Sequence, residues 1–458
     1  MYSLLIILLV LVVFFPTLRS GYVIDDEDVK NVARHEPKNK WQKFYWQFKG
    51  YKYFDSQPEH LINLILHLMV CLLIYFAFGQ DKVSFLTACL FAVNPAGTQG
   101  SIWLSGKGYT LTAIVMLLAW WLCPLFYLLT PFVALSGILA PFLFLKTSWW
   151  WVGLIPVVVI FMKYSPTQSH ALKHRLNETA GIGNKISPIK AVIALKTLGY
   201  YFCLALFPIR LGIYHKYLYT YSLSEADNKY WEKIDRFFWI GLTVFLVLIY
   251  NYFFNYNQTV FGLFWFFIFI APFLNLMSLG QAIGERYLYL AMIGVMYSLA
   301  NMIMLIPDYS IRLVVFTSIF VYYLTRLQFH IPTYKNIEAC VEYNMLNFPD
   351  MHAVWLWKGQ LDRKNGSYFT ALENWFKGWK IRKVDFRLNN NIAVMLTELG
   401  FLNDAEAFLK NAEENIIPEQ RKIAMEYITK QREIIANERK RLNNQHIANK
   451  IIMPGRRS

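Results

Sequence analysis

Charged residues are scarce in this chain. Only 16% of the 458 residues are Asp, Glu, Lys or Arg, whereas 56% are hydrophobic and 17% are aromatic. A soluble domain of this size rarely has so few charges, so the whole chain is not expected to be one soluble domain. Long uncharged runs recur from residue 2 to about residue 328, which is typical of a membrane protein with many spans.

The chain also has few cysteines, and none of the five shows metal-ligand spacing. Four lie inside apolar runs, so we expect small buried side chains rather than a disulfide framework or a zinc site. There is no paired Gly-rich phosphate loop, no HExxH motif and no credible Ser/His/Asp set. We therefore predict no cofactor and assign no metal ligand, and dependence on a divalent metal stays open.

The formal charge of +15 indicates the kind of partner. An excess of Lys and Arg suits contact with anionic lipid head groups or lipid phosphates. Nucleic acid is the other usual partner of a basic chain. It is discounted here because the basic residues are spread over loops that flank apolar runs.

Apolar runs of this length predict an all-α fold whose first part is a polytopic helical bundle of about eleven spans. The first run has no Lys or Arg before it and no small-residue cleavage site before Arg19, so we expect an uncleaved span. The predicted spans are 2–18, 59–79, 82–95, 107–124, 126–145, 148–164, 190–208, 234–255, 258–276, 286–306 and 310–328.

Basic residues orient these spans. The loop 163–190 carries five Lys or Arg residues, which places it in the cytoplasm. The acidic stretch after the first span, the turn 94–106, the loops 209–233 and 277–285 and the C-terminal region then lie outside. The loop 19–58 is basic as well, but its stretch 39–54 alternates Lys with aromatic residues, as a helix lying flat in the membrane interface would.

Two domains are predicted, 1–328 in the membrane and 329–458 outside it. In the second, "GSYFTALENWF" begins at Gly366 and "GFLNDAEAFLK" begins 34 residues later at Gly400. This is the spacing of tetratricopeptide repeats, which stack helix pairs into a protein-binding solenoid. Only about two and a half units are present, followed by a capping helix over 419–449 and a basic tail.

Polar residues on the predicted outer side are candidates for chemistry. "VIDDEDV" (23–29) places Asp25 and Asp26 about one turn outside the first span. They form either a solvated boundary loop or a catalytic carboxylate. His60, Asn63 and His67 share one helix face, where helix–helix hydrogen bonding and a substrate-lined cavity are comparable interpretations.

Further candidates are cationic or aromatic. Glu285 and Arg286 stand at the mouth of a span, where Arg could snorkel or could bind phosphate with Glu285 holding its guanidinium. Lys107 follows the Gly- and Pro-rich turn "NPAGTQGSIWLSGKGYTL" and is a second phosphate candidate. The outer loop with Tyr214 and His215 could bind sugar or peptide, or could anchor at the interface.

These motifs, in this order, resemble those of the GT-C membrane glycosyltransferases. The most similar group is the O-mannosyltransferases that combine transmembrane spans with tetratricopeptide repeats, and their bacterial relatives. The resemblance rests on "IDDEDV", "HLINLILH", the Gly-rich turn, "LKTLGYYFCLALFPIRLGIY", "ERYLYL" and the repeats. The chain departs from the eukaryotic pattern at Asn94, Gln99, Lys107 and Tyr109, which leaves the sugar and any metal open.

The resemblance implies a multi-pass plasma-membrane enzyme that moves a hexose, with inversion, from a polyprenyl-phosphate donor to a hydroxyl on a protein or glycan. The repeats could recruit that acceptor. The chemistry supports the residue types independently, because a hydroxyl needs a positioned base and the leaving phosphate needs fixed cations. Asp25 is the expected base, with Asp26 as its orienting neighbour.

Three other functions would explain parts of the sequence. An O-antigen-ligase-like or polymerase-like transferase with diphosphate-linked donors would depend on a large outer loop with His and Arg. A non-enzymatic membrane-anchored scaffold would explain the repeats but not the ordered polar residues. A transporter would show paired internal halves, and none is evident.

Overall fold

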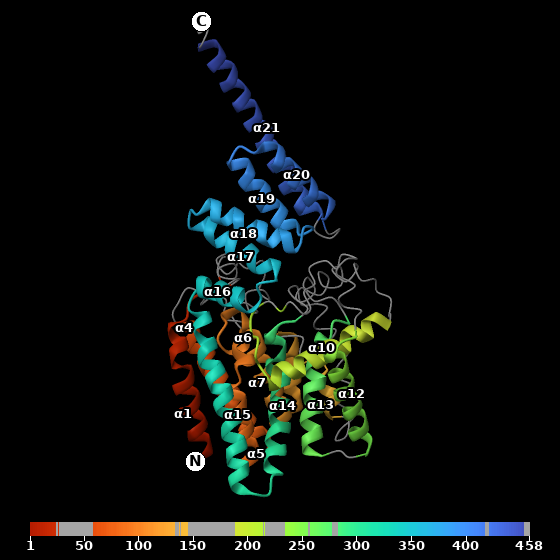
Figure 1. Cartoon of the computed structure of the whole chain (residues 1–458). Coiled ribbons are helices and arrows are strands. Elements are labelled where there is room, and N and C mark those ends of the chain that lie inside the picture. The colour runs from red at the N-terminus through yellow and green to blue at the C-terminus, as the bar shows by residue number, and fades with distance from the viewer. Residues whose placement is uncertain are drawn as a thin grey trace. The chain divides into compact units, whose positions relative to one another are not determined.

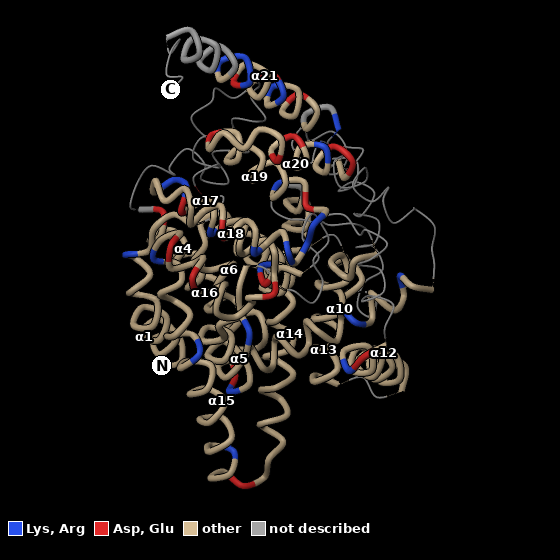
Figure 2. The backbone as a smooth tube through the Cα atoms, turned by 45° about the horizontal axis from the view of Figure 1, so that its top comes forward, with Lys and Arg blue, Asp and Glu red and all other residues tan. Residues whose placement is uncertain are grey.

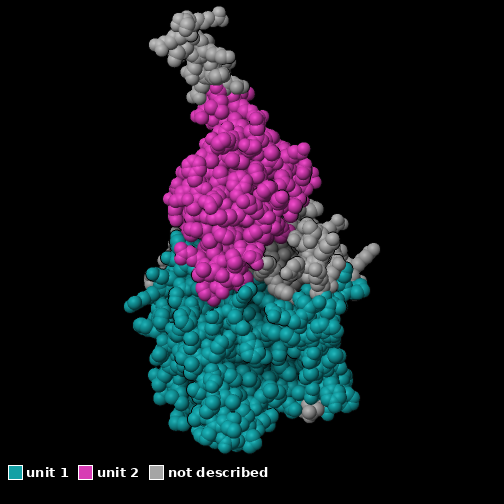
Figure 3. All heavy atoms as spheres, viewed as in Figure 1, with its two compact units in different colours: residues 1–340 teal, residues 341–458 magenta. Residues whose placement is uncertain are grey.

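In the computed structural model the described part of the chain is all-α, with no strand in it. It comprises residues 1–23, 26, 58–132, 137, 139–144, 188–213, 215, 234–254, 257–276, 283–416 and 421–452. The chain forms two compact units, Met1–Cys340 and Val341–Ser458, which are coloured separately in Figure 3. The predicted interfacial helix over 39–54 lies outside the described residues.

Six helical segments of the first unit are long and apolar enough to cross a membrane (Figure 1). Figure 2 shows them free of Lys, Arg, Asp and Glu over most of their length. This confirms the prediction that the chain has several helices apolar enough to be membrane spans. The six are α1 with η1 (Tyr2–Phe14 and Phe15–Arg19), α4 (Pro58–Ala77), α10 (Pro188–Leu206), α12 (Arg236–Phe254), α14 (Glu285–Met304) and α15 (Tyr309–His330).

The described part of the chain thus contains fewer full-length spans than the eleven predicted. The predicted span 148–164 lies outside the described residues, and 126–145 lies partly outside them. What is described near the latter consists of two short 3-10 helices, η5 (Pro124–Phe132) and η7 (Ala140–Phe144). Prolines at 124, 131 and 141 explain this, because each removes a backbone donor and interrupts an α-helix. Hydropathy alone does not register that interruption.

Two further predicted spans are short helices. They are α5 (Lys82–Val93) and α13 (Gln258–Ile270), which continues into η11 (Ala271–Phe273). At 1.5 Å per residue, the 12 residues of α5 extend only about 18 Å, well short of a bilayer core. The chain therefore turns within the bundle after α5.

The turn after α5 is a buried, broken helix, as its glycines and proline predict. It comprises η3 (Pro95–Gly97), α6 (Thr98–Ser101) and η4 (Leu104–Gly106), and it leads into α7 (Lys107–Trp121). The two halves meet at 86°. A Cβ at Gly106 would lie 1.7 Å from the Gln99 carbonyl oxygen, so only glycine fits there. The glycine thus fixes the positions of Gln99 and Lys107 relative to each other.

A close glycine contact joins α13 to α14. A Cβ on Gly294 would lie 2.2 Å from the carbonyl oxygen of Gly262 and 2.8 Å from the amide nitrogen of Phe266. Both atoms belong to the backbone, so the helices themselves would have to separate. Small residues of this kind let helix backbones approach closely, which is how helices associate in membranes without a hydrophobic driving force.

Gly294→Ala should therefore destabilise the first unit by about 3 kcal/mol, the upper range for overpacking. The matched control is Gly97→Ala, whose Cβ would lie 3.2 Å from the flexible Met292 Cε. Thermal unfolding of both full-length variants in detergent checks this. Equal midpoints for the two variants would contradict the close-contact argument.

The second unit is built from helix pairs with a period of 34 residues. Helices α17 (His352–Lys364) and α18 (Tyr368–Ile381) form one pair, and α19 (Phe386–Glu398) and α20 (Leu402–Glu414) form the next. Gly366 and Gly400, with φ of 80° and 84°, make the turn within each pair. Both need glycine, because other residues rarely adopt positive φ. The helices α16 (Ile337–Asn347) and α21 (Arg421–Ile452) flank the pairs.

A buried ionisable pair makes the second unit sensitive to acid. His352 Nε2 lies 3.2 Å from Asp385 Oδ2, and Asp385 also caps α19 through the Leu388 amide. Burial lowers the pKa of His352 even though Asp385 opposes the shift. Burial alone would raise the pKa of Asp385, but the His352 hydrogen bond and the Arg387 charge outweigh it and leave that pKa below its usual range.

Both lowered pKa values make the folded second unit less stable in acid. With each folded pKa depressed, the unfolded chain binds protons first, below about pH 6.5 at His352 and below about pH 4 at Asp385. The stability of the second unit should therefore fall as pH drops from 7 to 5. His352→Gln should make this fall shallower. Hydrogen exchange of α19 peptides in the full chain measures it, and an unchanged slope would rule out His352 as the titrating group.

Candidate functional site

Four segments predicted to face one side of the membrane gather at one end of the first unit. Asn63 donates to the carbonyl oxygens of Ile102 and Trp103 at 3.2 and 3.3 Å, which ties α4 to the broken turn. Gln99 in the turn donates to the Gly212 carbonyl at 3.0 Å, and the Gly212 amide donates to Glu285 at 2.6 Å. The turn, the segment after α10 and the start of α14 therefore form one polar region.

Asp26 belongs to this region as well. Its Oδ1 accepts from the Ser105 amide at 3.0 Å and from the Ser105 hydroxyl at 2.7 Å, and its Oδ2 accepts from the Val23 amide at 3.0 Å. The side chain is fully buried. Asp26 is therefore held against the turn rather than solvated, which disfavours the solvated-loop interpretation for this residue.

The first turn of α4 contributes a buried ion pair. Lys107 Nζ contacts Glu59 Oε2, and both side chains are at most 5% exposed. Lys107, predicted to bind phosphate, is therefore neutralised by a carboxylate. His60 lies beside them, near the carbonyls of Gly21 and Ile102, and is also buried. His67, further along α4, bonds the Tyr289 hydroxyl at 2.7 Å within the core, which fits helix–helix bonding.

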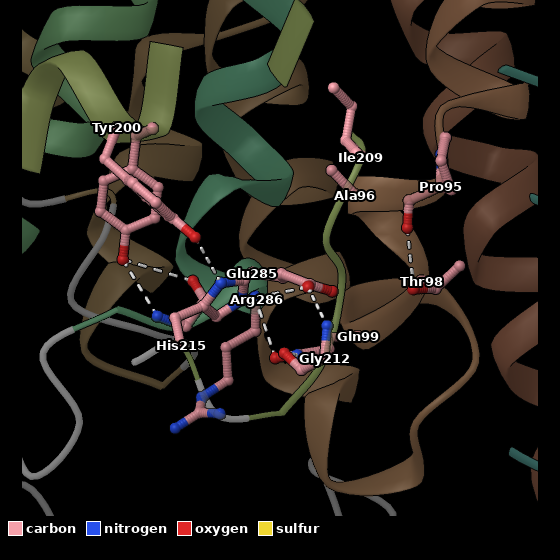
Figure 4. Close-up of polar contacts among 12 residues, drawn as sticks. Pro95, Ala96, Thr98, Gln99, Tyr200, Ile209, Gly212, His215, Glu285 and Arg286 are labelled. Carbon is pink, nitrogen blue, oxygen red and sulfur yellow. Dashed lines mark hydrogen bonds and ion pairs between the residues drawn. The ribbon is translucent and has the colours of Figure 1, made fainter. Parts of the chain in front are cut away.

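Glu285 is the centre of a second buried network, shown in Figure 4. Its Oε1 accepts from the Gly212 amide and lies 3.1 Å from His215 Nε2. The other ring nitrogen of His215 lies 2.8 Å from the Tyr200 hydroxyl. Glu285 was a candidate for holding the guanidinium of Arg286. Its oxygen instead fastens the segment after α10 to the start of α14.

Arg286 points away from Glu285 (Figure 4). Its backbone amide donates to Gln99 Oε1 at 3.3 Å. Its guanidinium carbon lies 5.3 Å from the Trp103 ring centre and 5.0 Å from that of Tyr287, so it stacks on aromatic faces. Trp103 thus connects the Arg286 side of the region to Asn63 and α4.

Two predicted site residues, Asp25 and Tyr214, lie outside the described residues, so the assignment of the base to Asp25 stays a prediction. Three residues that sequence reasoning did not assign are Glu59, Ser105 and Tyr200. Glu59 could have been identified from the sequence, because a charged residue next to His60 at the mouth of a span needs a partner. No sequence pattern identified Ser105 or Tyr200, since their partners are distant in the chain.

The arrangement attaches a carboxylate, Asp26, and a guanidinium, Arg286, to the same broken turn through Ser105 and Trp103. Such a combination can hold an anionic leaving group and orient a hydroxyl nucleophile. Among the described residues, no three His, Cys, Asp or Glu side chains are placed to share a metal ion. Comparisons of the chain with protein-family models, curated proteins and solved structures found no match.

Proposed function

We propose that this protein is a GT-C-like integral membrane glycosyltransferase that moves a hexose from a polyprenyl-phosphate donor to a hydroxyl acceptor. One observation carries the proposal. Asp26, which follows the first predicted span, accepts two hydrogen bonds from Ser105 in the broken turn, and Arg286 stacks on Trp103 of the same turn. An acidic residue and a cation from opposite ends of the first unit's sequence are thus brought to one short segment.

In this proposal, Asp25 is the base and Arg286 stabilises the leaving group. The acceptor hydroxyl gives its proton to the Asp25 carboxylate as its oxygen bonds the sugar's anomeric carbon. The bond from that carbon to the phosphate oxygen breaks on the opposite face, which inverts the configuration. The departing lipid phosphate gains negative charge, and Arg286 stabilises it there. Asp26, with both oxygens engaged, orients Asp25 and the turn.

The remaining elements have supporting roles in this proposal. Glu285, Gln99 and His215 fasten the described segment after α10 beside Arg286, and we assign this segment to the acceptor site. The 34-residue helix pairs of the second unit are tetratricopeptide repeats that recruit the acceptor. The polar end of the first unit faces the periplasm or the extracellular space.

The experiment that tests this function uses the purified full-length protein in lipid nanodiscs. Polyprenyl phosphates carrying different hexoses are incubated with Ser- and Thr-rich acceptor peptides, and mass spectrometry follows a gain of one hexose. We expect transfer from at least one monophosphate donor and none from the matched diphosphate lipid. Transfer only from the diphosphate lipid would favour the ligase-like alternative, and a reporter that places residue 326 in the cytoplasm would contradict the site's sidedness.

A further inference from the structure

The first turns of α4 present buried polar atoms that lack hydrogen-bond partners among the described residues. They are Glu59 Oε1, His60 Nδ1 and Asn63 Oδ1. Their residues are 1%, 7% and 3% exposed. A buried polar atom without a partner costs about 1–3 kcal/mol. Three such atoms within two turns of one helix therefore call for a functional explanation.

The neighbouring bonds show that these atoms belong to one place. Glu59 and Asn63 are four residues apart, so their side chains lie on one helix face. Glu59 uses its other oxygen for Lys107, and Asn63 uses its amide group for the carbonyls of Ile102 and Trp103. The broken turn thus holds both side chains by one end and leaves the other end of each unsatisfied.

We propose that Glu59, His60 and Asn63 form a neutral subsite for the hydroxyl groups of a sugar, separate from the cationic Arg286 that takes the phosphate. This inference rests on the proposed function, since it assigns the hexose of the donor to α4. A sugar hydroxyl both donates and accepts, so it can satisfy a carboxylate oxygen, an amide oxygen and either tautomer of a ring nitrogen.

Other ligand classes fit these atoms less well. A phosphodiester has only acceptors, so it could not bond Glu59 Oε1 and would be repelled by that carboxylate. A metal cation would face the ammonium of Lys107, which already contacts Glu59. An apolar group would leave all three atoms unsatisfied. The paired charges of Glu59 and Lys107 make the subsite neutral overall, which suits an uncharged sugar ring.

Glu59→Gln tests the subsite directly. Lys107 needs an acceptor, so the new amide should turn its oxygen toward Lys107 and place its NH₂ where Oε1 now stands. A donor then replaces an acceptor at an almost unchanged shape. Binding is measured for the full-length protein in nanodiscs with two probes, a short-chain polyprenyl phosphate without sugar and the same lipid carrying a hexose. Glu338→Gln on α16, partly exposed, is the matched control.

We expect Glu59→Gln to weaken binding of the hexose-bearing lipid by about tenfold or more, the loss of one buried hydrogen bond, and to leave the sugar-free lipid unchanged. Arg286→Ala should weaken both lipids alike. Equal weakening of both lipids by Glu59→Gln, or of neither, overturns the inference. So does a sugar preference that disappears when a chelator removes divalent cations, because the subsite would then hold a cation.

A second variant, His60→Phe, and a second probe, a methyl hexopyranoside, test the same subsite. If Glu59→Gln shows no folded state by thermal unfolding, His60→Phe removes Nδ1 without touching the ion pair, and the same two-lipid pattern is required of it. If neither lipid binds the wild-type protein, the proposed function fails. Stabilisation by methyl hexopyranosides that is lost in Glu59→Gln would then support the subsite alone, and its absence would remove both.

Discussion

Replacing Arg286 with Ala should lower sugar transfer by about 10²–10³-fold, as expected for the loss of one preorganised group at the leaving phosphate. The guanidinium is already fixed by the rings of Trp103 and Tyr287, so little reorganisation is needed when the phosphate gains charge. Arg286→Lys should recover only part of the rate, because Lys lacks the planar fork that binds two phosphate oxygens. Single-turnover transfer in nanodiscs measures both.

Arg312 provides the matched control for Arg286. It lies near the start of α15, where its guanidinium donates to the Ile306 carbonyl at 2.7 and 3.1 Å, close to the far end of α14. Arg312→Ala should cost some stability and no catalysis. If Arg286→Ala keeps a near-normal rate at normal expression, Arg286 is only an interfacial anchor stacked on aromatic rings, and the phosphate-binding role is lost.

Local sequence patterns predicted the helices and the broken turn well, because both depend on residues close together in the chain. Apolar runs identified the long helices, and Gly97, Gly100 and Gly106 marked the interruption. The spacing between Gly366 and Gly400 predicted the helix pairs, since each needs positive φ at its turn. The number of long helices was less predictable, because prolines inside apolar runs change the backbone without changing the hydropathy.

The partners within the candidate site were not predictable in the same way. Glu285 was expected to hold Arg286, its neighbour in sequence, but adjacent residues on a helix point in different directions. Its recorded partners are Gly212 and His215, about seventy residues earlier in the chain. Lys107 was predicted as a candidate for binding a lipid phosphate, and its recorded partner is Glu59, 48 residues earlier in the chain. Residue types and their depth indicated which groups matter, but only the packing of helices decides which of them meet.

Within the acidic stretch after the first predicted span, the contacts of Asp26 are described. Asp26 accepts three hydrogen bonds, two on Oδ1 and one on Oδ2. In Asp26→Asn the amide nitrogen must face either Ser105 or Val23, and both sides offer a backbone N–H. On either side, the new NH₂ group would therefore face a backbone N–H donor, and the substitution should loosen the turn. Ser105→Ala, which removes only the hydroxyl bond, should show a milder form of the same defect.

Asp25→Asn should have the largest effect on catalysis. It keeps the size of the side chain but removes its charge and basicity, so a general base at this position predicts a fall in turnover of about 10²–10⁴-fold with donor binding retained. Asp26→Asn should fall between Asp25→Asn and wild type, and Asp28→Asn should be close to silent. Turnover and donor affinity are measured separately for each purified variant, with thermal unfolding to identify misfolded protein. Mild, equal losses for all three would mark the stretch as a boundary loop, and full activity in Asp25→Asn would remove this carboxylate from the reaction.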